Sequence, residues 1–83
     1  MTVNRTEIEQ QVSAAVATVA GVGTESVEAG SDLVADLSLD SLAMYELVID
    51  LEERYGLRIS DEDLDRIHTV SDIVDYIDRS IDA

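Results

Sequence analysis

Apolar residues recur at helical spacing in three long segments of this 83-residue chain, and the first predicts a helix over residues 7–20. Thr6 and Glu9 have the spacing of a capping box, in which two residues at a helix start satisfy each other's main-chain N–H groups. Gly21 follows the segment and suits the left-handed conformation that commonly ends a helix. The buried stripe expected on this helix comprises Ile8, Val12, Ala15, Val16 and Val19.

The second helix pattern begins at Ser41, with Asp40 as its expected N-cap, and ends at Gly56. At about 100° per residue, its apolar residues fall on two nearly opposite faces. The face expected to pack into the core comprises Met44, Leu47, Val48, Leu51 and Tyr55. The opposite face comprises Leu42, Tyr45 and Ile49, with Glu46, Asp50 and Glu53 beside it and Glu52 on its other edge.

A short helix is predicted at residues 61–66 and a longer one over residues 70–81. Thr69 is the expected N-cap of the longer helix, because Asp72 follows it at the capping-box position. The buried stripe expected on this last helix comprises Val70, Ile73, Val74, Ile77 and Ile81.

Residues 22–40 form a long connection, which suits so small a domain only if its apolar residues pack into the core. We expect an ordered loop with a helical turn near residues 31–35. The candidates for packing are Val22, Val27, Leu33, Leu37 and Leu39. Because no long segment alternates with period two, the predicted fold is all-α: a small bundle of three major helices plus one short helix, with a long loop between the first and second helices.

The composition, with 46% apolar and 29% charged residues, indicates a folded chain, and its length suits a single domain over residues 1–83. The absence of cysteine excludes disulfides, thiolate metal sites and cysteine catalysis. We find no signal-peptide pattern and no apolar run long enough to span a bilayer. We therefore expect a cytoplasmic protein, a monomer with no metal site of its own.

The charge is strongly acidic, with 19 acidic residues against 5 arginines and a net charge of −14. Such a chain repels nucleic-acid phosphates and anionic lipid, so we expect neither nucleic acid nor membrane as a partner. Basic protein surfaces are the expected partners.

Ser41 is the candidate for chemistry, because it stands at a helix start beside Asp40. As a nucleophile it needs a base, and the chain's one histidine, His68, lies far along the sequence without the Gly-x-Ser-x-Gly pattern of a hydrolase. As a cap it is ordinary. As a modification site it is well placed, since a phosphodiester there meets free N–H groups and the positive end of the helix dipole. Asp40 then serves the modifying enzyme, through a divalent metal.

The second apolar face of the helix after Ser41 has two interpretations. Either the helix is central and buried on both sides, or the face is a docking surface with an apolar centre for affinity and a carboxylate edge for orientation. Its position directly after Ser41 favours docking.

Two further classes stay open from the residues alone. Asp61-x-Asp63-x-Asp65 resembles the start of a calcium loop, but Arg66 and Asp72 stand where glycine and glutamate are required. A cofactor-free acidic interaction domain accounts for the charge and the apolar face, but leaves the motif around Ser41 unexplained.

The segment Asp36-Leu-Ser-Leu-Asp40-Ser41-Leu42 resembles the attachment motif of acyl carrier proteins, commonly Asp-Leu-Gly-x-Asp-Ser-Leu. The likeness extends over most of the chain. It includes residues 31–33, 46–48, 51–56, 59–64 and 69–77.

The resemblance implies a carrier rather than an enzyme. Ser41 would bear 4′-phosphopantetheine, transferred from coenzyme A by a magnesium-dependent phosphopantetheinyl transferase, and the arm's thiol would hold acyl groups as thioesters. Acyltransferases, ketosynthases and other acyl-processing enzymes of type II fatty-acid or polyketide biosynthesis would dock through basic surfaces. The residues implied to face them are Leu42, Tyr45, Glu46, Ile49, Glu52 and Glu53. Met44, Val48 and Ile59 are candidates to line a cleft for the acyl chain.

Several departures from the family pattern bear on the pathway rather than on attachment. Ser38 replaces the usual glycine, and Ala43 and Tyr45 differ from the common residues on the docking helix. A specialised polyketide carrier is therefore as well supported as a fatty-acid carrier. A carrier of aminoacyl units is the remaining alternative, although the Gly-Gly-x-Ser core usual in peptidyl carriers is absent.

Overall fold

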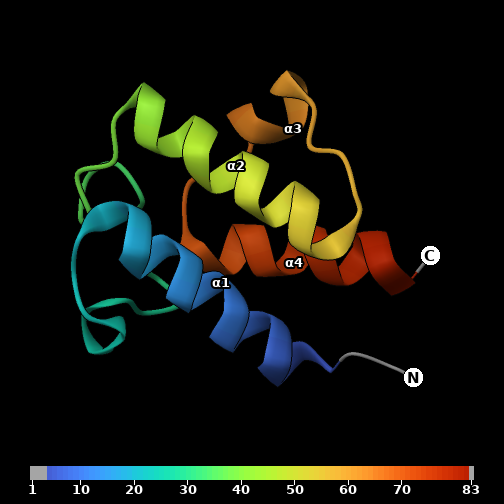
Figure 1. Ribbon diagram of the computed structural model, residues 1–83, viewed down its shortest axis with the longest axis horizontal. Coiled ribbons are helices and arrows are strands. Elements are labelled where there is room, and N and C mark those ends of the chain that lie inside the picture. The colour runs from blue at the N-terminus through green and yellow to red at the C-terminus, as the bar shows by residue number, and fades with distance from the viewer. Residues whose placement is uncertain (1–3, 83) are drawn as a thin grey trace.

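The computed structural model describes residues 4–82, and within them the regular elements are helices. Figure 1 shows three long helices and the short α3 beside the C-terminal half of α2. The elements are α1 (Arg5–Ala20), the 3-10 turn η1 (Thr24–Ser26), α2 (Ser41–Tyr55), α3 (Asp61–Asp65) and α4 (Val70–Asp82). The predicted all-α bundle is confirmed.

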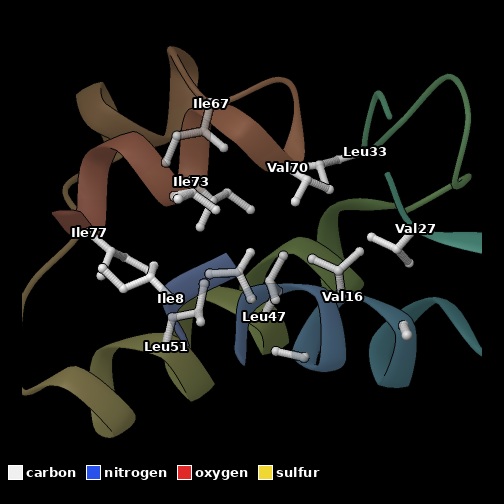
Figure 2. Packing of buried hydrophobic residues seen from close by; sticks show 14 of the residues in the cluster. Ile8, Val16, Val27, Leu33, Leu47, Leu51, Ile67, Val70, Ile73 and Ile77 are labelled. Carbon is white, nitrogen blue, oxygen red and sulfur yellow. The ribbon is translucent and has the colours of Figure 1, made fainter. Parts of the chain in front are cut away.

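The core forms where α1 packs against both α2 and α4. Figure 2 shows Ile8 of α1, Leu47 and Leu51 of α2, and Ile73 and Ile77 of α4 converging on one apolar centre. The predicted buried stripes of the three long helices are confirmed, although four of their residues are only half-buried. Ala17 of α1, which was not predicted, is also buried. The half-buried members are Val19, Met44, Tyr55 and Ile81.

The first helix starts two residues earlier than predicted. Asn4 is its N-cap, and the Asn4 side chain accepts a hydrogen bond from the Glu7 N–H at 2.9 Å. The proposed capping box of Thr6 and Glu9 is therefore wrong: both residues lie inside the helix, because asparagine is as good a cap as threonine and occurs earlier. Gly21 ends the helix with φ +73°, as predicted.

The long connection is ordered by its own turns and by apolar anchors. Leu33, Leu39 and Val27 are buried, whereas Val22, a predicted anchor, is 41% exposed. The packing prediction for Val22 is wrong because the chain turns outward directly after Gly21. The helical turn predicted near residues 31–35 appears as a bond from the Asp36 N–H to the Asp32 C=O at 3.0 Å. The η1 turn was not predicted.

The same connection pairs with the chain just before α4. The Leu33 N–H donates to the His68 C=O at 2.9 Å, and the Val70 N–H donates to the Ser31 C=O at 3.2 Å. An isolated antiparallel bridge joins Asp32 to Thr69 in the same place. The loop before α2 is thereby attached to the start of α4, although the two segments lie far apart in sequence.

Two sets of polar contacts hold α4, one at its start and one in its middle. At its start, the Asp72 N–H donates to Thr69 Oγ1 and the Thr69 N–H donates to Asp72 Oδ2, both at 3.1 Å, so the predicted capping box is confirmed. A further bond comes from the His68 N–H to Asp72 Oδ2 at 2.9 Å. Farther along, Arg5 of α1 forms ion pairs with Asp75 and Asp78.

We predict that the Asp72 carboxylate of this capping box stabilises the fold less at acidic pH. Hydrogen bonds from the His68 and Thr69 N–H groups hold the pKa of Asp72 below its ordinary value of 3.8. A lowered folded-state pKa means that the carboxylate stabilises the fold above the unfolded-state pKa, and that this contribution is lost as the pH falls through the folded-state pKa. Near neutral pH, Asp72→Asn should cost about 0.5–2 kcal/mol of unfolding free energy.

The measurement is urea unfolding of both proteins from neutral pH down to about pH 3, near the range where carboxylates titrate. The free-energy difference between wild type and Asp72→Asn should shrink below about pH 4. Asp65→Asn removes the same charge from an exposed position and controls for general repulsion. A difference that stays constant across this range would contradict the role given to the carboxylate.

Candidate functional site at the start of α2

Ser41 is the first residue of α2 and its side chain is exposed. The preceding residue, Asp40, is the N-cap, as predicted: its Oδ1 accepts from the Ala43 N–H at 2.8 Å. The first main-chain bond of the helix runs from the Met44 N–H to the Asp40 C=O at 2.9 Å. The N–H groups of Ser41 and Leu42 therefore precede the helical ladder and lie at the positive end of the helix dipole.

The loop enters this helix through a strained residue and a buried one. Ser38 has φ +59°, the one non-glycine residue with positive φ among residues 4–82. Leu39 is then buried in the core, with its N–H bonded to the Leu33 C=O at 3.0 Å. This arrangement fixes Asp40 and Ser41 at the surface, and it explains why a residue type without a Cβ suits position 38.

The second apolar face of α2 is exposed. Leu42 is 67% exposed, and Tyr45 and Ile49 are each 53% exposed. The interpretation that the helix is buried on both sides is therefore wrong. We call Leu42, Tyr45 and Ile49 the α2 strip; such an exposed apolar row is typical of an interaction surface.

The carboxylates around the α2 strip differ in whether they bind other groups of the protein. Glu46 and Glu53 are exposed. Asp50 forms an ion pair with Arg54, whose Nε lies 3.0 Å from Asp50 Oδ2. Glu52 is half-buried, and its Oε2 accepts from the Ile59 N–H at 2.8 Å. Glu52 thus binds the loop after α2, a structural task that the helical pattern did not reveal.

A surface pocket of about 430 Å³ opens beside Ser41. Three segments line it: Val34 and Leu39 from the loop, Asp40, Ser41, Met44 and Tyr45 around the start of α2, and Leu64 from α3. The exposed hydroxyl, the helix N-terminus and the apolar walls fit a phosphate-linked arm attached at Ser41.

The pocket takes in one of the three residues expected to line a cleft. Met44 lines it, but Val48 is buried, and Ile59 lines a separate pocket of about 610 Å³ with Ile49 and Glu53. Sequence reasoning missed Val34, which is 62% exposed. The sequence signal that could have indicated Val34 is a large apolar residue within an otherwise polar turn.

The two alternative chemistries find little support in the site. His68 lies before α4, with its N–H and C=O engaged in the bonds described above, and it does not line the pocket beside Ser41. Asp61, Asp63 and Asp65 belong to the helix α3 rather than to a calcium loop. Among residues 4–82, no group of three or more His, Cys, Asp or Glu side chains is arranged to hold a metal ion.

None of the helices described for residues 4–82 combines the length and the apolar character that crossing a bilayer requires.

Comparison with known proteins points to one family. Residues 10–77 match the family described as "Phosphopantetheine attachment site", a class of proteins that carry 4′-phosphopantetheine. The acyl carrier protein of Thermotoga maritima is 37% identical over 78 residues, covering 94% of this chain and 96% of the relative. That of Thermosynechococcus vestitus is 38% identical over 80 residues, covering 96% and 99%.

A relative with a more specific name is the meromycolate extension acyl carrier protein of Mycobacterium leprae, 35% identical over 79 residues, covering 95% of this chain and 69% of the relative. From these matches, the chain belongs to the acyl carrier protein family, whose members are carriers rather than enzymes and use 4′-phosphopantetheine as cofactor. Members of this family interact with acyl-processing enzymes.

We predict that Ser38→Gly stabilises the protein. The left-handed conformation costs a residue with a side chain about 1–2 kcal/mol, and glycine avoids this cost but loses more chain entropy on folding. The net gain in unfolding free energy should be up to about 1 kcal/mol. Urea unfolding measures it, with Ala35→Gly, an exposed position of the same loop without positive φ, as the control. A loss of stability in Ser38→Gly would show that the Ser38 side chain itself stabilises the loop.

Proposed function

We propose that Ser41 carries the 4′-phosphopantetheine and that residues 1–83 act as one carrier domain, holding acyl groups for type II fatty-acid or polyketide enzymes. The observation that supports this most is the exposed Ser41 hydroxyl at the start of α2, beside an apolar pocket, in a chain of this family. The thiol of the attached arm supplies the thioester chemistry.

Loading requires a phosphopantetheinyl transferase as the first partner. The Ser41 oxygen forms a bond to the pantetheine-side phosphorus of coenzyme A, the diphosphate linkage breaks, and adenosine 3′,5′-bisphosphate leaves while the hydroxyl proton passes to a base of the transferase. One oxygen of Asp40 is engaged by the Ala43 N–H, and the other remains for the transferase's divalent metal. The Ser41 and Leu42 N–H groups favour the negative charge of the phosphodiester.

The α2 strip, together with Glu46 and Glu53, is the proposed docking surface for acyltransferases, ketosynthases and the transferase. The apolar strip provides contact area close to Ser41, and the free carboxylates orient a basic partner surface. The charge of −14 accelerates encounter with such a surface. Glu52 contributes through the oxygen that does not bind Ile59. Nothing in this arrangement requires a second copy of the chain, so we propose a monomer.

A lipid-type acyl cargo is favoured over an aminoacyl unit. The Mycobacterium leprae relative is named for meromycolate extension, and the pocket beside Ser41 has apolar residues in its walls. The choice between a fatty-acid and a polyketide pathway depends on the enzymes that accept the loaded protein.

We predict that Ser41→Ala abolishes loading without harming the fold. Incubation with coenzyme A, magnesium and a broad-specificity phosphopantetheinyl transferase should add the mass of one phosphopantetheine to the wild type and nothing to Ser41→Ala, as read by intact mass spectrometry. Because Asp40 is the cap, the substitution should change the unfolding free energy by less than about 0.5 kcal/mol. Ser80→Ala, an exposed serine of α4, should load normally. Loading of Ser41→Ala would refute the assignment.

We predict that Glu46→Lys weakens docking. Reversing an exposed charge at the edge of the α2 strip should raise the transferase's KM about three- to tenfold at low salt, with a smaller effect on kcat. Added salt should reduce the difference, since exposed charges are screened. Glu25→Lys makes the same charge change on the exposed η1 turn and serves as the control. Equal KM values for both variants would show that Glu46 does not belong to the docking surface.

A further inference from the structure

The short helix α3 is held to the bundle by few apolar contacts. It has five residues, none of them buried, and only Asp63 and Leu64 are half-buried. The nearest core residue in sequence is Ile67, two positions after the helix ends. A helix this short is not stable by itself, so its position depends on contacts with its neighbours, the polar ones included.

Tyr76 of α4 makes those contacts. Its hydroxyl oxygen lies 2.7 Å from the Arg58 carbonyl oxygen and 2.9 Å from Asp63 Oδ2, so one proton serves two acceptors. Ser60 supports the same carboxylate: its Oγ lies 2.9 Å from Asp63 Oδ2 and accepts from the Asp63 N–H at 3.1 Å. We call the contacts of Tyr76 with Arg58 and Asp63 the Tyr76 latch.

The loop between α2 and α3 is held from two sides. On the α2 side, Glu52 Oε2 accepts from the Ile59 N–H, and on the α4 side, Tyr76 contacts the Arg58 carbonyl. Of these two side chains, Tyr76 also reaches α3 itself, through Asp63. Opening of α3 therefore requires the Tyr76–Asp63 contact to break, whereas the Glu52 contact can remain.

The position of α3 matters for the pocket beside Ser41. Leu64 follows Asp63 and lines that pocket opposite Met44 and Tyr45 of α2. Successive residues of a helix point about 100° apart, so the contact that draws Asp63 toward α4 also sets where Leu64 stands. A change in the latch thus moves one wall of the pocket.

We propose that Tyr76 is a positioning residue whose hydroxyl holds α3 in place beside α4. When the Tyr76–Asp63 contact breaks, Leu64 moves and the pocket beside Ser41 widens. The latch itself is a property of the unmodified chain. Its consequence for a group attached at Ser41 rests on the proposed function.

The first experiment is amide hydrogen exchange of unmodified wild type and Tyr76→Phe. The substitution keeps the ring and removes the hydroxyl. Amides in residues 61–67 should exchange about tenfold faster, while the slowest amides of α1 change much less, because the loss is local. Arg5→Gln, which breaks the ion pairs of Arg5 with Asp75 and Asp78, controls for a general loosening of α4 and should leave residues 61–67 unchanged. Unchanged exchange in residues 61–67 of Tyr76→Phe, or equal acceleration at all amides, overturns the latch.

The second experiment loads Ser41 with a coenzyme A analogue that bears a polarity-sensitive fluorophore on the pantetheine thiol. Tyr76→Phe should shift the emission to the blue relative to wild type, because the wider pocket admits the fluorophore, and Arg5→Gln should match wild type. Identical spectra for all three proteins would overturn the control of the pocket by Tyr76. Failure of Ser41 to load, with faster exchange in Tyr76→Phe, would reject the proposed function and support the latch.

Discussion

The attachment of the long loop to the start of α4 is the interaction on which the rest of the structure depends. Three main-chain bonds join segments that are far apart in sequence: Leu33 to His68, Val70 to Ser31 and Ser71 to Ala29. The fully buried Leu33 side chain adds apolar contact at the same place. With the loop held there, the short path through Ser38 and Leu39 leaves Asp40 little freedom. Contacts of the preceding loop therefore fix the start of α2, and its first residue, Ser41, remains exposed.

The acidity of the chain serves two different purposes. Several carboxylates accept hydrogen bonds from main-chain N–H groups that a helix or turn leaves without partners, as Asp32, Asp40, Glu52 and Asp72 do. Others, such as Glu46, remain exposed and free to meet a partner. A strongly negative chain can fold because part of its charge stabilises loops and helix starts, while the remainder gives the surface a long-range negative potential.

The site joins a long helix that packs into the core to the short helix α3, which has no buried residue. Ser41 stands on a long helix whose other face is packed into the core, whereas Leu64 reaches the same pocket from a five-residue helix without a buried side chain. The contact of Tyr76 with Asp63 ties this short helix to α4.

Local pattern determined the helices, their core stripes, the caps at Asp40 and Thr69 and the two-faced character of α2, since each depends on residues a few positions apart. The motif around Ser41 also indicated the family before any geometry was known. Only the tertiary structure decided that the α2 strip is exposed, that Asn4 rather than Thr6 caps α1 and that Val34 and Leu64 share a pocket with Ser41. It alone revealed Glu52 bound to Ile59 and Tyr76 bound to Asp63. These contacts join residues whose separation in sequence has no fixed period, so no local rule encodes them.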